Sequence, residues 1–171
     1  ALRRLPEFGI EGAGTDLTLR TVEEADWANA WKAFYKPIRV GRHLVVTPPW
    51  ETPDLGAADI PLVIDPGMAF GTGSHPTTQL CLASLEDYLQ PGMQVADIGT
   101  GSGILAIAAA KLGAAKVTAT DIDPLAVQIA AENITINGVS ITTQEALPTG
   151  TYDLVVANIL ADVIIGLSDT L

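Results

Sequence analysis

The sequence has few of the features that mark secreted, membrane or nucleic-acid-binding proteins. It contains one cysteine, Cys81, so no disulfide can form within the chain. Only 9 Lys and Arg stand against 20 Asp and Glu, and the net charge of -11 offers little cationic surface for phosphates. No apolar stretch reaches the roughly 18 residues of a membrane span, and the first residues lack the apolar core of a secretory signal. We therefore expect a cytoplasmic protein that binds neither membranes nor nucleic acids directly.

Two compositional regions divide the 171 residues. The first holds all three tryptophans and most of the basic residues, whereas the second is poor in aromatics and rich in Ala, Gly, Ile and Val. A proline-rich segment, 47–59, lies between them, and proline interrupts helices and strand ladders. The sequence predicts a partial N-terminal substrate-recognition region and linker over 1–55, and a second domain over 56–171.

The first region carries one pattern typical of a helix and one typical of a strand. After an acidic first turn near residue 22, aromatic side chains recur at helical spacing: Trp27, Trp31, Phe34 and Tyr35. This stripe packs on its own domain or forms a face for docking a substrate. Segment 38–48 is predicted to be a strand.

From residue 93 the pattern alternates between strands and helices. Strands are predicted at 93–97, 116–123, 139–143 and 152–160, and helices at 104–113 and 124–138. This alternation predicts an α/β fold, a Rossmann-like, doubly wound and mainly parallel sheet, with a small N-terminal α+β part. Because four strands leave an open edge, we expect the chain to lack C-terminal strands and the start of its N-terminal region.

The segment DIGTGSG, 97–103, follows a predicted strand and opens a helix, where doubly wound sheets bind nucleotide-like ligands. Its glycines allow a tight turn and a close approach of the ligand to the backbone. A dinucleotide fingerprint would need glycine where Ile104 stands. A carboxylate at Asp97 would repel a pyrophosphate but attract the ammonium and sulfonium of S-adenosyl-L-methionine. A glycine-rich turn without a ligand is the alternative.

Further acids follow the second and third predicted strands. Asp121 lies 24 residues after Asp97, close to the offset of about 20 at which an acid accepts ribose hydroxyls. Asp123 is either a second such acid or the N-cap of a helix that begins at Pro124. Glu145 either reaches an adenine amino group or is a solvated loop acid.

Segment 65–82 is a glycine-rich loop, including Gly67, that carries His75, Thr77 and Thr78 before a short helix. We interpret it as a lid over the cleft. Alternatively, a threonine caps the helix and the histidine is structural.

The fourth predicted strand ends at Asn158, whose side-chain amide can accept a hydrogen bond from an amine substrate. Its apolar neighbours Ile159 and Leu160 would keep water from that site. The sequence has no Cys and His spacing typical of zinc, no P-loop and no nucleophile elbow, so we expect no metal.

Taken together, these segments resemble the bacterial methyltransferases that modify large-subunit ribosomal protein eleven. The resemblance covers 23–50, 62–82, 97–117, 120–127 and 157–161. DPGMAFGTGSHPTT is specific to that family, whereas DIGTGSG marks the wider class of S-adenosylmethionine enzymes. The resemblance implies S-adenosyl-L-methionine as cofactor and methylation of lysine side-chain amines of that ribosomal protein, with an N-terminal amine as a further candidate.

The family's site residues carry over at matching positions. Its cofactor contacts fall on Thr78, Gly99, Asp121 and Asn158, and its active-site loop residues on His75 and Thr77. Family members commonly have Cys where this chain has Thr100, and they have a fuller N-terminal domain and three further strands. The predicted catalytic residues are thus Asn158, His75 and Thr77, and the predicted cofactor-binding residues are Thr78, Asp97, Gly99, Gly101, Gly103, Asp121, Ile122 and Asn158.

Other functions remain open on the sequence alone. A methyltransferase of glutamine or of a nucleic-acid base shares the cofactor loop, but many carry Asn-Pro-Pro-aromatic where this chain has Asn-Ile-Leu-Ala at 158–161. A nicotinamide-dependent dehydrogenase conflicts with Ile104. A catalytically incomplete cofactor-binding fragment is the non-enzyme alternative.

Overall fold

The structure, a computed structural model, describes residues 31–65 and 71–167. The chain divides into two compact units, Ala1–Phe34 and Tyr35–Leu171. In the first unit only the short 3-10 helix η2, Trp31–Phe34, is described. Of the other residues of the predicted aromatic stripe, Tyr35 is not helical and Trp27 lies outside the described residues. The described strands and α-helices all belong to the second unit.

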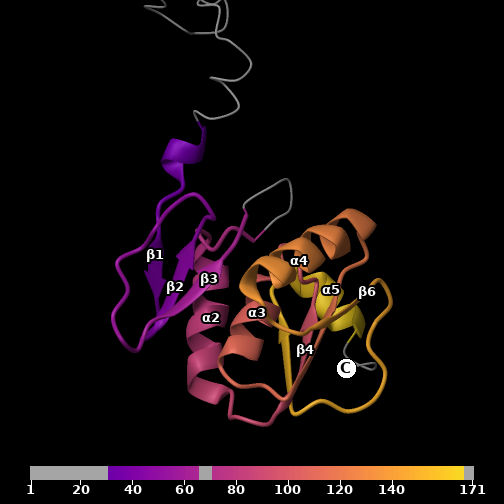
Figure 1. Ribbon diagram of the computed structural model, residues 1–171. Coiled ribbons are helices and arrows are strands. Elements are labelled where there is room, and N and C mark those ends of the chain that lie inside the picture. Colours follow the sequence, from indigo (N-terminus) through magenta and orange to yellow (C-terminus); the bar gives the residue numbers. More distant parts are fainter. Residues whose placement is uncertain (1–30, 66–70, 168–171) are drawn as a thin grey trace, which may run out of the picture. The chain divides into compact units, whose positions relative to one another are not determined.

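A three-stranded sheet opens the second unit. It contains β1 (Ile38–Val40), β2 (Leu44–Thr47) and β3 (Ile60–Val63), in the order β1-β2-β3 (Figure 1). The prediction of one strand over 38–48 is wrong, because the chain turns back at Gly41, whose φ is +63°, and β1 and β2 pair antiparallel. Glycine adopts that left-handed conformation without the steric cost of a Cβ atom.

Most of the proline-rich segment, 48–59, is a connection within this sheet. The strands on either side of it, β2 and β3, pair in parallel, with Leu44 opposite Ile60. The chain divides into compact units between Phe34 and Tyr35, and the predicted domains, 1–55 and 56–171, stay a prediction. Prolines interrupt a loop inside a sheet as readily as they mark a linker between domains.

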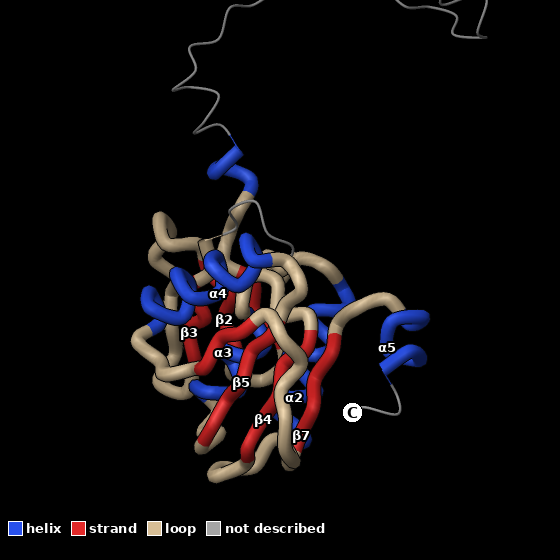
Figure 2. Tube along the Cα trace, turned by 90° about the vertical axis from the view of Figure 1, so that its right-hand side faces the viewer, coloured by secondary structure: helices blue, strands red, loops and turns tan. Residues whose placement is uncertain are grey.

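The second sheet has four parallel strands, as predicted. They are β4 (Gln94–Ile98), β5 (Lys116–Thr120), β6 (Thr142–Gln144) and β7 (Leu154–Ala157), in the order β6-β5-β4-β7 (Figure 2). Ile98 is level with both Thr120 and Ala157. The carboxyl ends of three neighbouring strands therefore share one edge of the sheet.

Four described α-helices complete the second unit. They are α2 (Pro76–Tyr88), α3 (Ile104–Lys111), α4 (Pro124–Asn137) and α5 (Ala161–Leu167). The interpretation of Asp123 as an N-cap is confirmed, because its Oδ1 accepts the backbone N–H of Leu125 at 2.9 Å. None of the described helices has the length and apolar character needed to cross a membrane.

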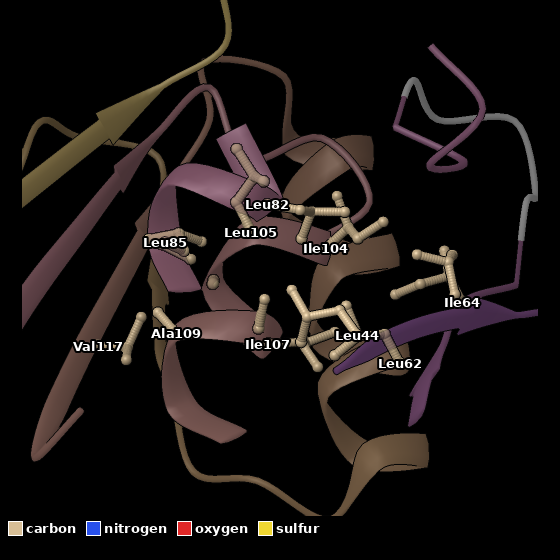
Figure 3. Close-up of a cluster of buried hydrophobic side chains, with 14 of the residues drawn as sticks. Leu44, Leu62, Ile64, Leu82, Leu85, Ile104, Leu105, Ile107, Ala109 and Val117 are labelled. Atoms are coloured by element: carbon tan, nitrogen blue, oxygen red, sulfur yellow. The ribbon is translucent and has the colours of Figure 1, made fainter. Parts of the chain in front are cut away.

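The hydrophobic core joins the two sheets through α3. All α3 residues from 104 to 109 are buried, and Ile107 lies near Leu44 and Leu62 of the first sheet (Figure 3). Val117 of the second sheet belongs to the same cluster. Burial of each leucine or isoleucine contributes about 1.5–3 kcal/mol to the stability of the fold. The packing of both sheets on α3 therefore keeps the strand ends in place.

Candidate functional site

The glycine-rich loop connects the end of β4 to the start of α3. The backbone N–H of Gly99 donates to the carbonyl oxygen of Thr120 at 2.8 Å, which ties the loop to β5. Gly103 is the N-cap of α3 with φ +84°, and a Cβ atom there would lie 3.2 Å from that of Ala130 on α4. Glycine at this position therefore allows α4 to pack closely against the loop.

Asp121 follows β5 directly, and its carboxylate is held by two backbone groups. Oδ2 accepts the N–H of Gly101 and Oδ1 accepts the N–H of Asp123, each at 3.0 Å. Each carboxylate oxygen has more than one acceptor position, so both can still receive a hydroxyl group of a ligand. The acid is thus oriented before any ligand arrives.

Asp97 lies beneath the glycine-rich loop and is fully buried. Its Oδ2 accepts Oγ1–H of Thr100 at 2.6 Å and N–H of Ala106 at 3.1 Å. Its Oδ1 is buried without a hydrogen-bond partner among the described residues. Burial raises the pKa of Asp97 to about 6, opposed by the two hydrogen bonds and reinforced by the charge of Asp121.

The first turn of α2 carries the predicted loop residues. His75 is the N-cap of this helix: its Nδ1 accepts the backbone N–H of Thr77 at 3.3 Å and lies 2.7 Å from Oγ1 of the same residue. The expectation that a threonine caps the helix is therefore wrong. Thr78 is 1% exposed, and its Oγ1 accepts Nδ2–H of Asn158 at 3.0 Å.

These segments surround a cavity of about 800 Å³ at the carboxyl ends of β4, β5 and β7. This volume suits a cofactor-sized molecule. The described lining contains acids and no Lys or Arg. The lining residues are Gly71, His75, Thr77, Thr78, Ile98, Gly99, Thr100, Gly101, Ile104, Leu105, Thr120, Asp121, Ile122, Glu145, Leu147, Asn158, Ile159, Leu160, Val163 and Leu167.

Most of the predicted site residues meet in this cavity, although they come from distant parts of the sequence. Those that line it are His75, Thr77, Thr78, Gly99, Gly101, Asp121, Ile122 and Asn158. Asp97 and Gly103 lie outside the described lining, because one supports the loop from below and the other packs on α4. Gly67 falls outside the described residues. In the described part of the chain, no three Cys, His, Asp or Glu side chains cluster as metal ligands.

Sequence reasoning missed several apolar residues of the lining. Leu147, Val163 and Leu167 lie beyond the predicted motifs, and an isolated leucine or valine carries no signal of a site. It also missed Ser102, whose Oγ–H donates to the carbonyl oxygen of Gly71 at 2.6 Å. The only sequence signal for a role of Ser102 is its position between Gly101 and Gly103 of the motif.

Comparison with known proteins agrees with the family resemblance that the motifs indicate. The model of the family "Ribosomal protein L11 methyltransferase (PrmA)" matches residues 2–171. The chain belongs to this family.

Relatives that carry the name ribosomal protein L11 methyltransferase include those of Pelotomaculum thermopropionicum and Desulfitobacterium hafniense. The first is 53% identical over 161 residues, which is 91% of this chain and 52% of that protein. The second is 52% identical over 170 residues, 96% of this chain and 53% of that protein. The chain thus spans about half the length of the curated relatives it matches.

A solved structure supports the same assignment. The crystal structure of ribosomal protein L11 methylase from Lactobacillus delbrueckii subsp. bulgaricus superposes with a TM-score of 0.72 at 43% sequence identity. The superposition covers 78% of this chain and 71% of that chain. The fold predicted from the sequence is therefore shared with a member of the ribosomal protein L11 methyltransferase family.

Proposed function

We propose that the protein containing this chain transfers methyl groups from S-adenosyl-L-methionine to lysine side-chain amines of ribosomal protein L11, with the N-terminal amine as a further candidate acceptor. The family and the names of its members support the reaction class and the substrate. The single structural observation that carries the proposal is the cavity at the ends of the parallel strands, with the carboxylate of Asp121 held at its edge by the N–H of Gly101.

The size of the cavity and the charge of its lining support this cofactor. A Cβ atom on Gly99 would overlap the side chain of Ile159, so glycine allows Ile159, which also lines the cavity, to pack closely against the loop backbone. Asp121 and Glu145 give the lining an anionic character that favours the positive ammonium and sulfonium groups. Asp121 would hold the ribose hydroxyls, and Ile122, 94% exposed at the mouth, offers an apolar face for the adenine.

When bound, the cofactor supplies an activated methyl group that a neutral nitrogen can accept. A lysine must first lose its proton, which costs about 4 kcal/mol at pH 7.4 from a reference pKa near 10.4. Apolar neighbours such as Ile159 and Leu160 favour the neutral amine by excluding water. Because Asn158 uses Nδ2–H on Thr78, its amide presents Oδ1 to accept an N–H of the amine and orient its lone pair.

Buried Asp97 plays an indirect part in this proposal. Its carboxylate holds Thr100 and the first turn of α3, so it shapes the loop that carries Gly99 and Gly101. Its negative charge lies under the same loop and favours a cation in the cavity. Direct contact with the cofactor ammonium stays a prediction.

The test is methylation of defined substrates by the full-length protein. Methyl-labelled S-adenosyl-L-methionine is incubated with the enzyme and either purified ribosomal protein L11 or ribosomal RNA, and labelled peptides are located by mass spectrometry. We expect label on lysines of the ribosomal protein. Label on glutamine or on RNA would overturn the acceptor, and absence of cofactor binding by calorimetry would overturn the proposed reaction.

A further inference from the structure

Asn133 on α4 is a buried amide whose two ends bind different parts of the chain. Its Oδ1 accepts the backbone N–H of Asp65, and its Nδ2–H donates to the carbonyl oxygen of Ser102, both at 2.9 Å. The side chain is 1% exposed. A buried amide with both ends bonded imposes a definite geometry on its partners, since either partner left unpaired would be costly.

Ser102 extends this network from the glycine-rich loop to the opposite wall of the cavity. Its Oγ–H donates to the carbonyl oxygen of Gly71 at 2.6 Å, and a Cβ atom on Gly71 would lie 2.8 Å from that Oγ. Ser102 is also 1% exposed. One residue of the loop is thus bonded both to α4 and to a residue that lines the cavity.

The two partners of this network, Asp65 and Gly71, lie on either side of residues 66–70. Gly71 leads directly into the segment that carries His75, Thr77 and Thr78. The network therefore links Gly71, at the start of the cavity wall formed by 71–78, to the glycine-rich loop 97–103.

We propose that Asn133 and Ser102 are positioning residues that set the wall formed by 71–78 at the correct distance from the glycine-rich loop. Neither residue lines the cavity in the described part of the chain, so each acts through the backbone groups it holds. The proposal rests on the proposed function for its binding readout, because the cavity is taken to hold S-adenosyl-L-methionine.

Asn137 provides an internal comparison. It lies one helical turn after Asn133 on the same helix, and its side chain bonds β3: Oδ1 accepts the N–H of Val63 at 3.0 Å and Nδ2–H donates to the carbonyl oxygen of Val63 at 2.6 Å. Within the described part of the chain, its side-chain hydrogen bonds go to Val63 and to the carbonyl oxygen of Asn133, and none reaches the glycine-rich loop or Gly71. A purely structural role would make the two asparagines equivalent, whereas a positioning role would not.

The first experiment compares Ser102→Ala, Asn133→Ala and Asn137→Ala in the full-length protein. Calorimetry gives the Kd for S-adenosyl-L-methionine, and urea unfolding gives the stability of each variant. We expect Ser102→Ala and Asn133→Ala to weaken binding by about three- to tenfold, as the loss of one hydrogen bond implies, and Asn137→Ala to leave the Kd within about twofold. Equal weakening by the two asparagine variants would overturn the proposal.

The second experiment needs no cofactor. Hydrogen exchange is followed in peptides from 71–79, whose first helical turn includes the bond from N–H of Gln79 to the carbonyl oxygen of His75. Ser102→Ala, the mildest variant, should speed exchange there by about three- to tenfold, whereas Asn137→Ala should not. Unchanged exchange in Ser102→Ala would overturn the positioning role. If the unmodified protein binds no S-adenosyl-L-methionine, the proposed function fails and this readout alone decides the positioning role.

Discussion

The amide of Asn158 donates from Nδ2 to Oγ1 of Thr78 across 3.0 Å, joining two residues that are 80 positions apart in the sequence. Asn158 follows β7, and Thr78 lies in the first turn of α2. Thr78 is 1% exposed although it belongs to the cavity lining. This bond uses an N–H of the amide and leaves Oδ1 as its acceptor.

Replacing Thr78 by valine should therefore release the amide without changing the volume of the side chain. We expect kcat for methylation to fall by about tenfold, since an amide that rotates presents its donor end to the amine. Steady-state kinetics of the full-length enzyme measure this. Thr78→Ser keeps the hydroxyl and serves as the matched control, and an equal loss of kcat in both variants would contradict the explanation.

Asp121→Asn should weaken the binding of S-adenosyl-L-methionine by roughly ten- to a hundredfold, the value of a hydrogen bond to a charged acceptor. The neutral amide also loses one of the acceptors that serve Gly101 and Asp123. Calorimetry of the full-length protein gives the Kd.

The control for this change is Asp123→Asn. Asp123 caps α4 through the N–H of Leu125, and asparagine caps helices about as well as aspartate. We expect its Kd to stay within about twofold of the unmodified value. A larger effect at Asp123 than at Asp121 would show that the wrong acid has been assigned to the ribose.

The parallel sheet and the position of the cavity could be predicted because their signals are local. A run of apolar residues, a glycine-rich turn and an acid at the next strand end lie within 97–121, and parallel strands bring their carboxyl ends together. The N-cap at Asp123 could be predicted in the same way, because Pro124 favours the first position of a helix. Such features depend on neighbouring residues alone.

The remaining features depend on contacts between distant segments, which no local pattern reveals. The burial of Asp97 follows from α3 packing over it, so its carboxylate supports the loop from below. The bond from Asn133 to Ser102 spans 31 residues, and both side chains are polar types common on surfaces. The split of segment 38–48 into two strands depends on one turn at Gly41.

Asp97 should make stability depend on pH in a defined direction. Its pKa is raised from 3.8 in the unfolded chain to about 6 in the folded protein, chiefly by burial. The folded state therefore holds the proton more tightly, and this stabilisation, complete below pH 4, is lost as the pH rises through about 6. At pH 7.5 the buried charge destabilises the fold by on the order of 2–3 kcal/mol relative to the protonated form.

Asp97→Asn removes this titration while keeping one oxygen as an acceptor. We expect the urea-unfolding free energy of the variant minus that of the unmodified protein to increase between pH 4.5 and pH 7.5. Measurement in the absence of cofactor isolates the effect from ligand binding. A difference that stays constant over this range would show that the carboxyl group does not titrate as its burial indicates.

Gly99→Ala tests whether the loop conformation and the close contact with Ile159 both require glycine. Gly99 has a φ of +72°, and an added Cβ atom would overlap the side chain of Ile159. Gly138 has a φ of +64° with nothing within 4 Å of an added Cβ atom, so Gly138→Ala carries the backbone cost alone, about 1 kcal/mol.

We expect Gly99→Ala to lower the free energy of unfolding by more than Gly138→Ala does, and to weaken cofactor binding, which Gly138→Ala should leave unchanged. Adding Ile159→Ala to Gly99→Ala should recover only the steric part of the loss, because the left-handed backbone remains strained. Urea unfolding of the four proteins separates the two costs. Equal losses in the two single glycine variants would mean that Ile159 moves aside freely, so that only the backbone conformation requires glycine at this position.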